Sequence, residues 1–167
     1  MSEINTSNGV NIAIASDHAG YKTKEMLKQL LKQSGRDFTD FGTGSEDSVD
    51  YPDFAFKAAG AVSKGEYQRG ILICGTGLGM CIAANKVRGI RAVSPYDKFT
   101  AEMSRRHNDA NILCIGARAL TEDTIKEIVE IWLATPFSAE GGSASGEDTG
   151  NLRHQCRIQK ISDYESQ

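Results

Sequence analysis

The chain alternates short apolar runs with longer segments in which apolar residues recur at helical spacing. The runs are rich in isoleucine, valine and alanine and end at glycine, aspartate or proline, which is typical of buried strands. We expect strands over residues 10–15, 37–41, 71–74, 90–93 and 111–115.

Helical spacing fills the intervals between these runs. Residues 22–31 carry methionine and leucine on one face and lysine on the other. The same spacing predicts helices over residues 51–64, 96–106 and 121–133, and a helix that follows the third strand up to about residue 87. Because strand and helix alternate strictly, the sheet should be parallel and covered on both faces. The predicted fold class is α/β: a three-layer α/β/α, Rossmann-like domain with a five-stranded parallel sheet.

One domain is expected to span residues 1–167, because a chain of this length can bury most of its surface around a single core. Residues 1–9 are polar and are expected to be a frayed tail. Residues 138–152 are rich in glycine, serine and acidic side chains, which predicts a mobile loop. A helical segment, residues 153–167, should follow. Arg153 and Arg157 lie four positions apart on one face of it and could grip one phosphate together.

Charge and composition exclude several classes of partner. A net charge of -3 leaves no basic footprint for nucleic acid. No apolar run approaches the ~18 residues of a membrane span, and the polar N-terminus does not resemble a signal peptide, so we expect a cytoplasmic protein. The cysteines form no C-x-x-C pair, and the histidines show no ligand spacing with them, so we expect no disulfide scaffold and no metal site.

The most distinctive stretch follows the third predicted strand, which ends in Cys74. Gly75, Gly77 and Gly79 stand at alternate positions after it and can take backbone angles closed to other residues, so that successive N–H groups turn toward one small anion. The next helix adds the positive end of its dipole at the same place. Such a loop favours a phosphate, an enediolate oxygen or the thiolate of Cys74 itself. The alternative is a tight strand-to-helix turn with Cys74 as a small buried apolar residue.

Other polar residues follow neighbouring strands at the edge where ligands bind in this fold class. Asp17 and His18 come after the first strand, and Arg118 comes after the fifth. His107 and Asn108 precede the fifth strand, which places them at the opposite edge of the sheet. A neighbouring subunit's site is one explanation for that placement.

Seven blocks of the sequence resemble, in order and spacing, the type B ribose-5-phosphate isomerases. They are Ser16-Asp-His-Ala-Gly, Asp50-Tyr-Pro-Asp, Ile73-Cys-Gly-Thr-Gly-Leu-Gly, Ile82-Ala-Ala-Asn-Lys, Gly89-Ile-Arg-Ala, Arg106-His-Asn-Asp-Ala-Asn and Gly116-Ala-Arg. The resemblance covers residues 12–157. Isomerases of allose 6-phosphate and galactose 6-phosphate share much of the pattern. The pattern therefore identifies the type of reaction more closely than it identifies the substrate.

This resemblance implies an aldose–ketose isomerase that interconverts ribose 5-phosphate and ribulose 5-phosphate through a cis-enediolate, without metal or organic cofactor. Cys74 matches the catalytic base, and Met80 stands where another branch of the family carries a glutamate base. His107 matches the ring-opening residue, Asp17 a residue at the sugar hydroxyls, and Asn108, with the loop N–H groups, a holder of the enediolate. Thr76 would orient the thiolate. The resemblance implies substrate binding by His18, Tyr51, Gly75, Gly77, Gly79, Arg118, Arg153 and Arg157, and a homodimer, with a dimer of dimers as a further option.

The resemblance has one departure, and alternatives stay open beside it. The family follows a Gly-Gly pair directly with the Arg153 block, whereas residues 143–152 intervene here, which puts the reach of Arg153 and Arg157 in doubt. Taken alone, His107 followed by Asn108 also fits a helix end in which Asn108 is the left-handed stop, and Asp17 also fits a helix N-cap. A nucleotide-binding module is the rival function, although the loop is not G-x-G-x-x-G and does not follow the first strand.

Overall fold

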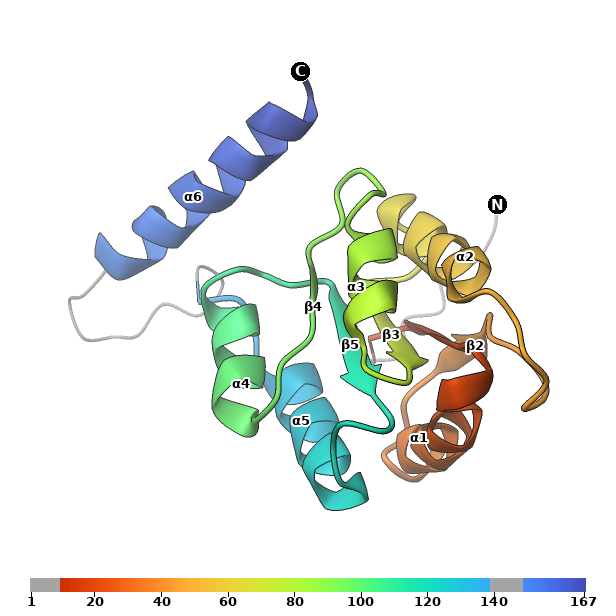
Figure 1. Ribbon diagram of the computed structural model, residues 1–167. Coiled ribbons are helices and arrows are strands. Elements are labelled where there is room, and N and C mark those ends of the chain that lie inside the picture. Colours follow the sequence, from red (N-terminus) through yellow and green to blue (C-terminus); the bar gives the residue numbers. More distant parts are fainter. Residues whose placement is uncertain (1–9, 139–148) are drawn as a thin grey trace, which may run out of the picture.

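The computed structural model describes residues 10–138 and 149–167 and has a single five-stranded sheet within those ranges (Figure 1). All pairs are parallel, in the order β2-β1-β3-β5-β4. The strands are β1 Ile12–Ser16, β2 Phe38–Asp40, β3 Arg69–Cys74, β4 Ala92–Val93 and β5 Ile112–Gly116. The register places Cys74 opposite Gly116, so the ends of β3 and β5 meet at one edge.

Seven helical elements connect or follow the strands in the described part of the chain. They are the 3₁₀ turn η1 His18–Gly20 and the helices α1 Tyr21–Gln33, α2 Tyr51–Ser63, α3 Leu78–Ala84, α4 Lys98–Arg106, α5 Glu122–Ala134 and α6 Thr149–Glu165. Side-chain caps fix the starts of α4 and α5. The Asp97 carboxylate accepts the N–H of Thr100 at 2.7 Å before α4, and the Thr121 hydroxyl accepts that of Thr124 at 3.3 Å before α5.

Two apolar cores, one on each face of the sheet, make the three layers. Helices α2 and α3 cover one face with alanines, Val62 and Met80, against the strand residues Ala13, Leu72 and Cys114. Helices α1, α4 and α5 cover the other face, where Trp132 is fully buried. Alternate residues of β1 and β3 enter opposite cores, as the two-residue period of a strand requires. The α/β/α, Rossmann-like fold with its five-stranded parallel sheet is thus confirmed.

The elements differ from the expected ranges mainly at their ends. Strand β4 begins at Ala92 rather than at residue 90, because the N–H of Arg91 donates to the Asn111 side chain instead of to the sheet. Helix α3 ends at Ala84, where Asn85 turns back to bond the Cys81 and Ala92 carbonyls. Helix α6 begins at Thr149, inside the segment 138–152 expected to be a loop. Residues 1–9 and 139–148 lie outside the described residues, so neither the expected tail nor most of the expected loop is seen.

Candidate active site

A first group of polar residues gathers at the carboxyl ends of β1 and β3. The chain leaves these neighbouring strands in opposite directions along the sheet, which opens the crevice where ligands bind in doubly wound folds. The turn after β1 is pressed against the end of β3: the N–H of Asp17 donates to the Ile73 carbonyl at 3.2 Å. A Cβ on Gly20 would lie 2.6 Å from that same oxygen, so the close approach requires glycine.

Cys74 ends β3 with its thiol held by the glycine loop. Its Sγ accepts the backbone N–H of Gly77 at 3.2 Å, and only 5% of the residue is exposed. Gly77 has φ 79°, and a Cβ there would come within 2.7 Å of the Ser94 hydroxyl. The backbone conformation that aims this N–H at the sulfur therefore depends on glycine.

The loop is shaped differently from a simple anion cradle in two respects. Helix α3 has only seven residues, so its dipole is small, and the donor recorded at the sulfur is the single N–H of Gly77. The resemblance implies that Thr76 orients the thiolate; in this structure its Oγ1 accepts the N–H of Leu78 at 3.4 Å, and the N–H that donates to the Cys74 sulfur is that of Gly77. Thr76 is exposed, at the outer side of the loop.

Two further predicted residues, Tyr51 and Arg118, border this loop. The ring of Tyr51 packs on Gly79, where a Cβ would lie 2.8 Å from the ring, and 38% of Tyr51 is exposed. The N–H of Arg118 donates to the Gly75 carbonyl at 2.9 Å, which fixes the start of its exposed side chain beside the loop. The structure thus brings Tyr51, Gly75, Gly79 and Arg118 to one place with Cys74.

Asp17 and His18 complete this first group. One carboxylate oxygen of Asp17 accepts the N–H of Gly20 at 3.0 Å, so Asp17 is an N-cap, as the alternative interpretation held, and caps η1. Nδ1 of His18 accepts the N–H of Val49 at 3.2 Å. An imidazole that accepts at Nδ1 while neutral carries its proton on Nε2, which leaves Nε2–H to donate to a ligand.

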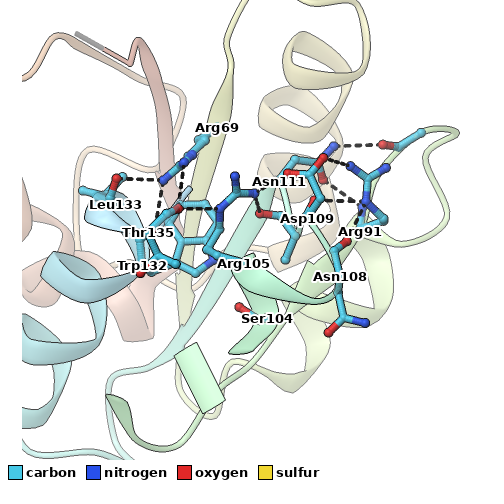
Figure 2. A network of polar contacts seen from close by, with 12 residues as sticks. Arg69, Arg91, Ser104, Arg105, Asn108, Asp109, Asn111, Trp132, Leu133 and Thr135 are labelled. Carbon is cyan, nitrogen blue, oxygen red and sulfur yellow. Dashed lines mark hydrogen bonds and ion pairs between the residues drawn. The ribbon is translucent and has the colours of Figure 1, made fainter. Parts of the chain in front are cut away.

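His107 and Asn108 lie at the other edge of the sheet, as predicted. His107 is the C-cap residue of α4, and its N–H donates to the Met103 carbonyl at 2.9 Å. The left-handed residue that stops the helix is Asp109, with φ 45°, rather than Asn108. Both His107 and Asn108 are exposed, and Figure 2 shows the Asn108 carboxamide pointing away from the polar network behind it.

That network clamps the loop after α4. The two oxygens of Asp109 accept separate arginines, Oδ1 from Nη1 of Arg105 at 2.8 Å and Oδ2 from Nη2 of Arg91 at 2.9 Å (Figure 2). Nε of Arg91 also donates to the carbonyls of Asn108 and Asp109, each at 3.0 Å. These bonds hold Asp109 in its left-handed conformation, which explains why the stop is Asp109.

Arg105 extends this network into the core beneath α5. Arg105 is buried and also bonds the carbonyls of Ala110 and Thr135. Its guanidinium and that of Arg69 lie 5.8 and 5.2 Å from the centre of the Trp132 ring. The backbone that carries His107 and Asn108 is therefore anchored to α5 and to the sheet.

Helix α6 brings a residue beside His107 that the sequence analysis passed over. The imidazoles of His107 and His154 stack with centroids 4.2 Å apart and planes inclined by 9°. His154 is 8% exposed, and burial, with the charges of His107, Arg153 and Arg157, lowers its pKa below the usual value of 6.5. Arg153 and Arg157 are exposed on the same helix, so both arginines accompany His107 rather than Cys74.

The sequence contained only partial signals for the residues that were missed. His154 lies inside the Arg153 block, but nothing local indicates that α6 turns back onto α4. Asp109 and Arg91 fall inside two of the resembling blocks, yet their pairing joins separate elements. Cys81 and Cys114 are paired thiols, and burial raises the pKa of Cys114 well above its ordinary value. A hydrogen bond from the Cys114 thiol lowers the pKa of Cys81.

Comparison with known proteins decides the family. The model of the ribose/galactose isomerase family matches residues 12–161. The chain belongs to this family. It is 48% identical to the ribose-5-phosphate isomerase B of Clostridium thermocellum, whose solved structure superposes with a TM-score of 0.84 and aligns over 93% of this chain and 97% of that one.

Two curated relatives show the range of activities among similar proteins. Ribose-5-phosphate isomerase B of Escherichia coli K12 is 42% identical, over 92% of this chain and 95% of its own length. D-erythrulose-4-phosphate isomerase of Pectobacterium atrosepticum is 40% identical, over 90% of this chain and 99% of its own length. Membership in a family of sugar-phosphate isomerases sets aside the nucleotide-binding alternative and leaves the substrate open.

Two further observations concern metal ions and membranes. Within the described residues no group of three histidine, cysteine, aspartate or glutamate side chains is arranged to hold a metal ion. No helix in residues 10–138 or 149–167 is long and apolar enough to cross a membrane.

Proposed function

We propose that this protein interconverts ribose 5-phosphate and ribulose 5-phosphate through a cis-enediolate, with Cys74 as the base and His107 as the ring-opening acid. In metabolism this would be a step of the pentose phosphate pathway, in the cytoplasm. The observation that carries the proposal is the Cys74 thiol at the end of β3, which is held by the Gly77 N–H. No carboxylate competes for the role at the next candidate position, because Met80 stands there and is fully buried.

The proposed chemistry begins with ring opening. His107 gives a proton to the ring oxygen O4 as the C1–O4 bond breaks, and the C1 hydroxyl gives its proton to solvent water, which leaves the open-chain aldehyde; His107 then regains a proton from water. The Cys74 thiolate then takes the proton from C2, and the electrons move into an enediolate across C1 and C2. A proton passes from O2 to O1 and the thiol returns its proton to C1, which gives the ketose. N–H donors near the enediolate oxygens, with Asn108, would lower this barrier by a few kcal/mol each.

The two groups of site residues support a homodimer with shared sites. Cys74, Asp17, His18, Tyr51 and Arg118 lie at the carboxyl edge of the sheet. His107, Asn108, Arg153 and Arg157 lie at the other side, on α4 and α6. One chain does not bring the groups together, so we infer that a second copy supplies the missing half of each site. Large apolar side chains exposed between the two groups fit such an interface; they are Leu78, Ile82, Tyr96 and Phe99, which are 60–69% exposed.

The choice of substrate is tested by comparing sugars of different length. We expect the highest kcat/KM for ribose 5-phosphate, because a site with a ring-opening histidine suits a sugar that cyclises. D-erythrulose 4-phosphate and its aldose cannot form a furanose, since their O4 carries the phosphate. The kcat/KM for ribose 5-phosphate should exceed that for allose 6-phosphate or galactose 6-phosphate by about 10- to 200-fold, which is the discrimination that a binding pocket typically achieves for one carbon. A higher kcat/KM for a four- or six-carbon substrate would assign the protein to that activity instead.

A comparison of the initial rates in the two directions of the reaction isolates the role of His107. Ribulose 5-phosphate is an open chain, because its O5 is esterified, so only turnover from ribose 5-phosphate needs ring opening. We expect His107→Ala to lower the initial rate from ribose 5-phosphate by about 100-fold or more. The rate from ribulose 5-phosphate should fall by less than about threefold. His18→Ala is the matched control and should impair both directions, whereas an equal loss in both directions for His107→Ala would contradict a ring-opening role.

A further inference from the structure

Beside the ring-opening histidine, the structure contains an aromatic contact that neither the proposed chemistry nor the family match uses. His107 is an exposed residue at the end of a helix, where an imidazole is ordinarily free to rotate about two side-chain bonds. Here its ring lies flat on that of His154, at 4.2 Å between centroids and 9° between planes. His154 is itself buried, so its ring is the fixed member of the pair.

We propose that His154 is a positioning residue, whose ring on α6 fixes the plane in which His107 presents its outer edge to the sugar. This inference rests on the proposed ring-opening role of His107. The Asp109 clamp fixes the backbone of His107, and the stack fixes the remaining freedom of its side chain. A proton donor must lie within hydrogen-bond reach of the ring oxygen, so an imidazole held in one plane reaches productive geometry more often than a rotating one.

The charges around the pair favour the neutral form of His154. His154 faces His107 from α4 and the guanidinium groups of Arg153 and Arg157 from α6, and burial adds to the cost of charging it, so its pKa is lowered. The lowered pKa favours the neutral form of His154, so the ring that lies on His107 is uncharged.

Helix α6 is tied down at its far end as well, which keeps His154 in place. The N–H of Gly89 donates to the Glu165 carboxylate at 2.8 Å, and the Arg88 guanidinium donates to the Ser166 hydroxyl at 2.8 Å. With the histidine stack near its start, α6 is held at two points along its length. Because Arg153 and Arg157 are on the same helix, the stack also sets the distance between His107 and the expected phosphate grip.

The experiment compares four proteins: wild type, His154→Ala, His154→Phe and Lys160→Ala. Phenylalanine keeps a flat ring that cannot carry charge, and Lys160→Ala changes an exposed residue of α6 away from the stack. We expect His154→Ala to lower turnover from ribose 5-phosphate about tenfold and turnover from ribulose 5-phosphate by less than about twofold. His154→Phe should return the first rate to within about threefold of wild type, and Lys160→Ala should change neither. Equal losses in both directions, no loss, or no rescue by phenylalanine would overturn the proposal.

A second measurement needs no turnover. The protein has three histidines, so the imidazole Cε1–H signals can be assigned by single substitutions. The His107 signal should carry a ring-current shift that is retained in His154→Phe and lost in His154→Ala, and an unchanged His107 signal in His154→Ala would refute the stack. If His107→Ala slows both directions equally, the ring-opening assignment fails, and this spectrum still decides whether His154 holds the ring.

Discussion

At the scale of single residues, the candidate site depends on the surroundings of one sulfur atom. Cys74 is nearly buried and accepts an N–H bond, whereas Cys156 is exposed on α6 and Cys114 lies in the core. Burial raises the pKa of Cys114, which keeps that thiol protonated and unreactive. Only Cys74 combines a strand end, a backbone donor and a border of polar side chains.

Replacement of Cys74 should therefore abolish proton transfer without unfolding the protein. We expect Cys74→Ala, and the nearly isosteric Cys74→Ser, to lower kcat at least about 100-fold in both directions of the reaction. Retention of more than about a tenth of kcat, less than ~1.4 kcal/mol of barrier, would contradict the assignment. Cys156→Ser serves as the control and as the background for iodoacetate labelling, which sugar phosphate should slow at Cys74.

At the scale of elements, buried charges fix the two loops that carry site residues. Lys24 of α1 is almost fully buried, and its Nζ donates to Asp40 at 2.7 Å and to the Thr43 carbonyl at 2.8 Å. This pair ties α1 to the end of β2 and to the loop that leads to Val49, the partner of His18. At the other edge of the sheet, Asp109 holds the loop that carries His107, because it forms ion pairs with both Arg91 and Arg105.

The Lys24–Asp40 pair predicts a stability difference that depends on pH. Burial opposes ionisation of Asp40, but hydrogen bonds from Lys24, Lys28 and the Gly42 N–H outweigh it and lower the pKa of Asp40. Ionised Asp40 thus stabilises the fold above the unfolded-state pKa of about 3.9, and this contribution is lost as pH falls through the lower folded-state value. Because Asp40 is partly exposed and solvent screens its charge, we expect Asp40→Asn to lower the free energy of unfolding by only about 1–2 kcal/mol at pH 7, and by progressively less below about pH 4.

Urea unfolding of both proteins across pH 2–7 measures this difference. The matched control is Glu46→Gln, which removes the exposed ion pair with Lys22 and should cost under about 1 kcal/mol at any pH. A constant difference between wild type and Asp40→Asn across the whole range would show that the charge of Asp40 is not the cause.

Asp109 offers a second test, with its control on α4, the helix that precedes it. Asp109→Asn keeps a side chain that tolerates the left-handed backbone but leaves buried Arg105 without its carboxylate. We expect a loss of about 3–4 kcal/mol in the free energy of unfolding. Glu102→Gln breaks the exposed i,i+4 pair with Arg106 and should cost about 0.5 kcal/mol or less. Similar losses in the two variants would mean that the clamp does not stabilise the loop.

At the scale of the whole molecule, the proposed function implies that one chain carries two incomplete sites. The residues after β1, β3 and β5 form one half, and the end of α4 with α6 forms the other. A dimer in which each copy contributes both halves would complete two sites at once. A dimer of dimers would repeat this arrangement without changing the chemistry.

Complementation between inactive chains tests the shared site. When Cys74→Ala and His107→Ala chains are mixed equally and exchange subunits, half of the dimers are mixed and each has one intact site of two. Activity from ribose 5-phosphate should therefore recover to about a quarter of the wild-type value. Either inactive chain mixed with itself is the control. No recovery after exchange has been verified by mass, or full activity in a sedimenting monomer, would refute a site built from two subunits.

The sequence by itself determined the alternation of strand and helix and the polar residues at the strand ends. Both follow from local rules, since periodicity sets which face is buried and glycine sets which backbone angles are open. Cys74 followed by Gly77 could therefore be recognised, and so could the placement of His107 before β5. The resembling blocks added the expected roles, which remain predictions for the assays above.

Only the tertiary structure decided which distant residues meet. The strand order puts β5 beside β3, which brings Arg118 to Gly75. The pairing of Asp109 with Arg91 moved the helix stop from Asn108 to Asp109, and the docking of α6 placed His154 on His107. Such contacts join elements far apart in the chain, and they form because the elements pack together and must satisfy the charges and polar groups they bury. No pattern within a single segment of the sequence indicates these contacts.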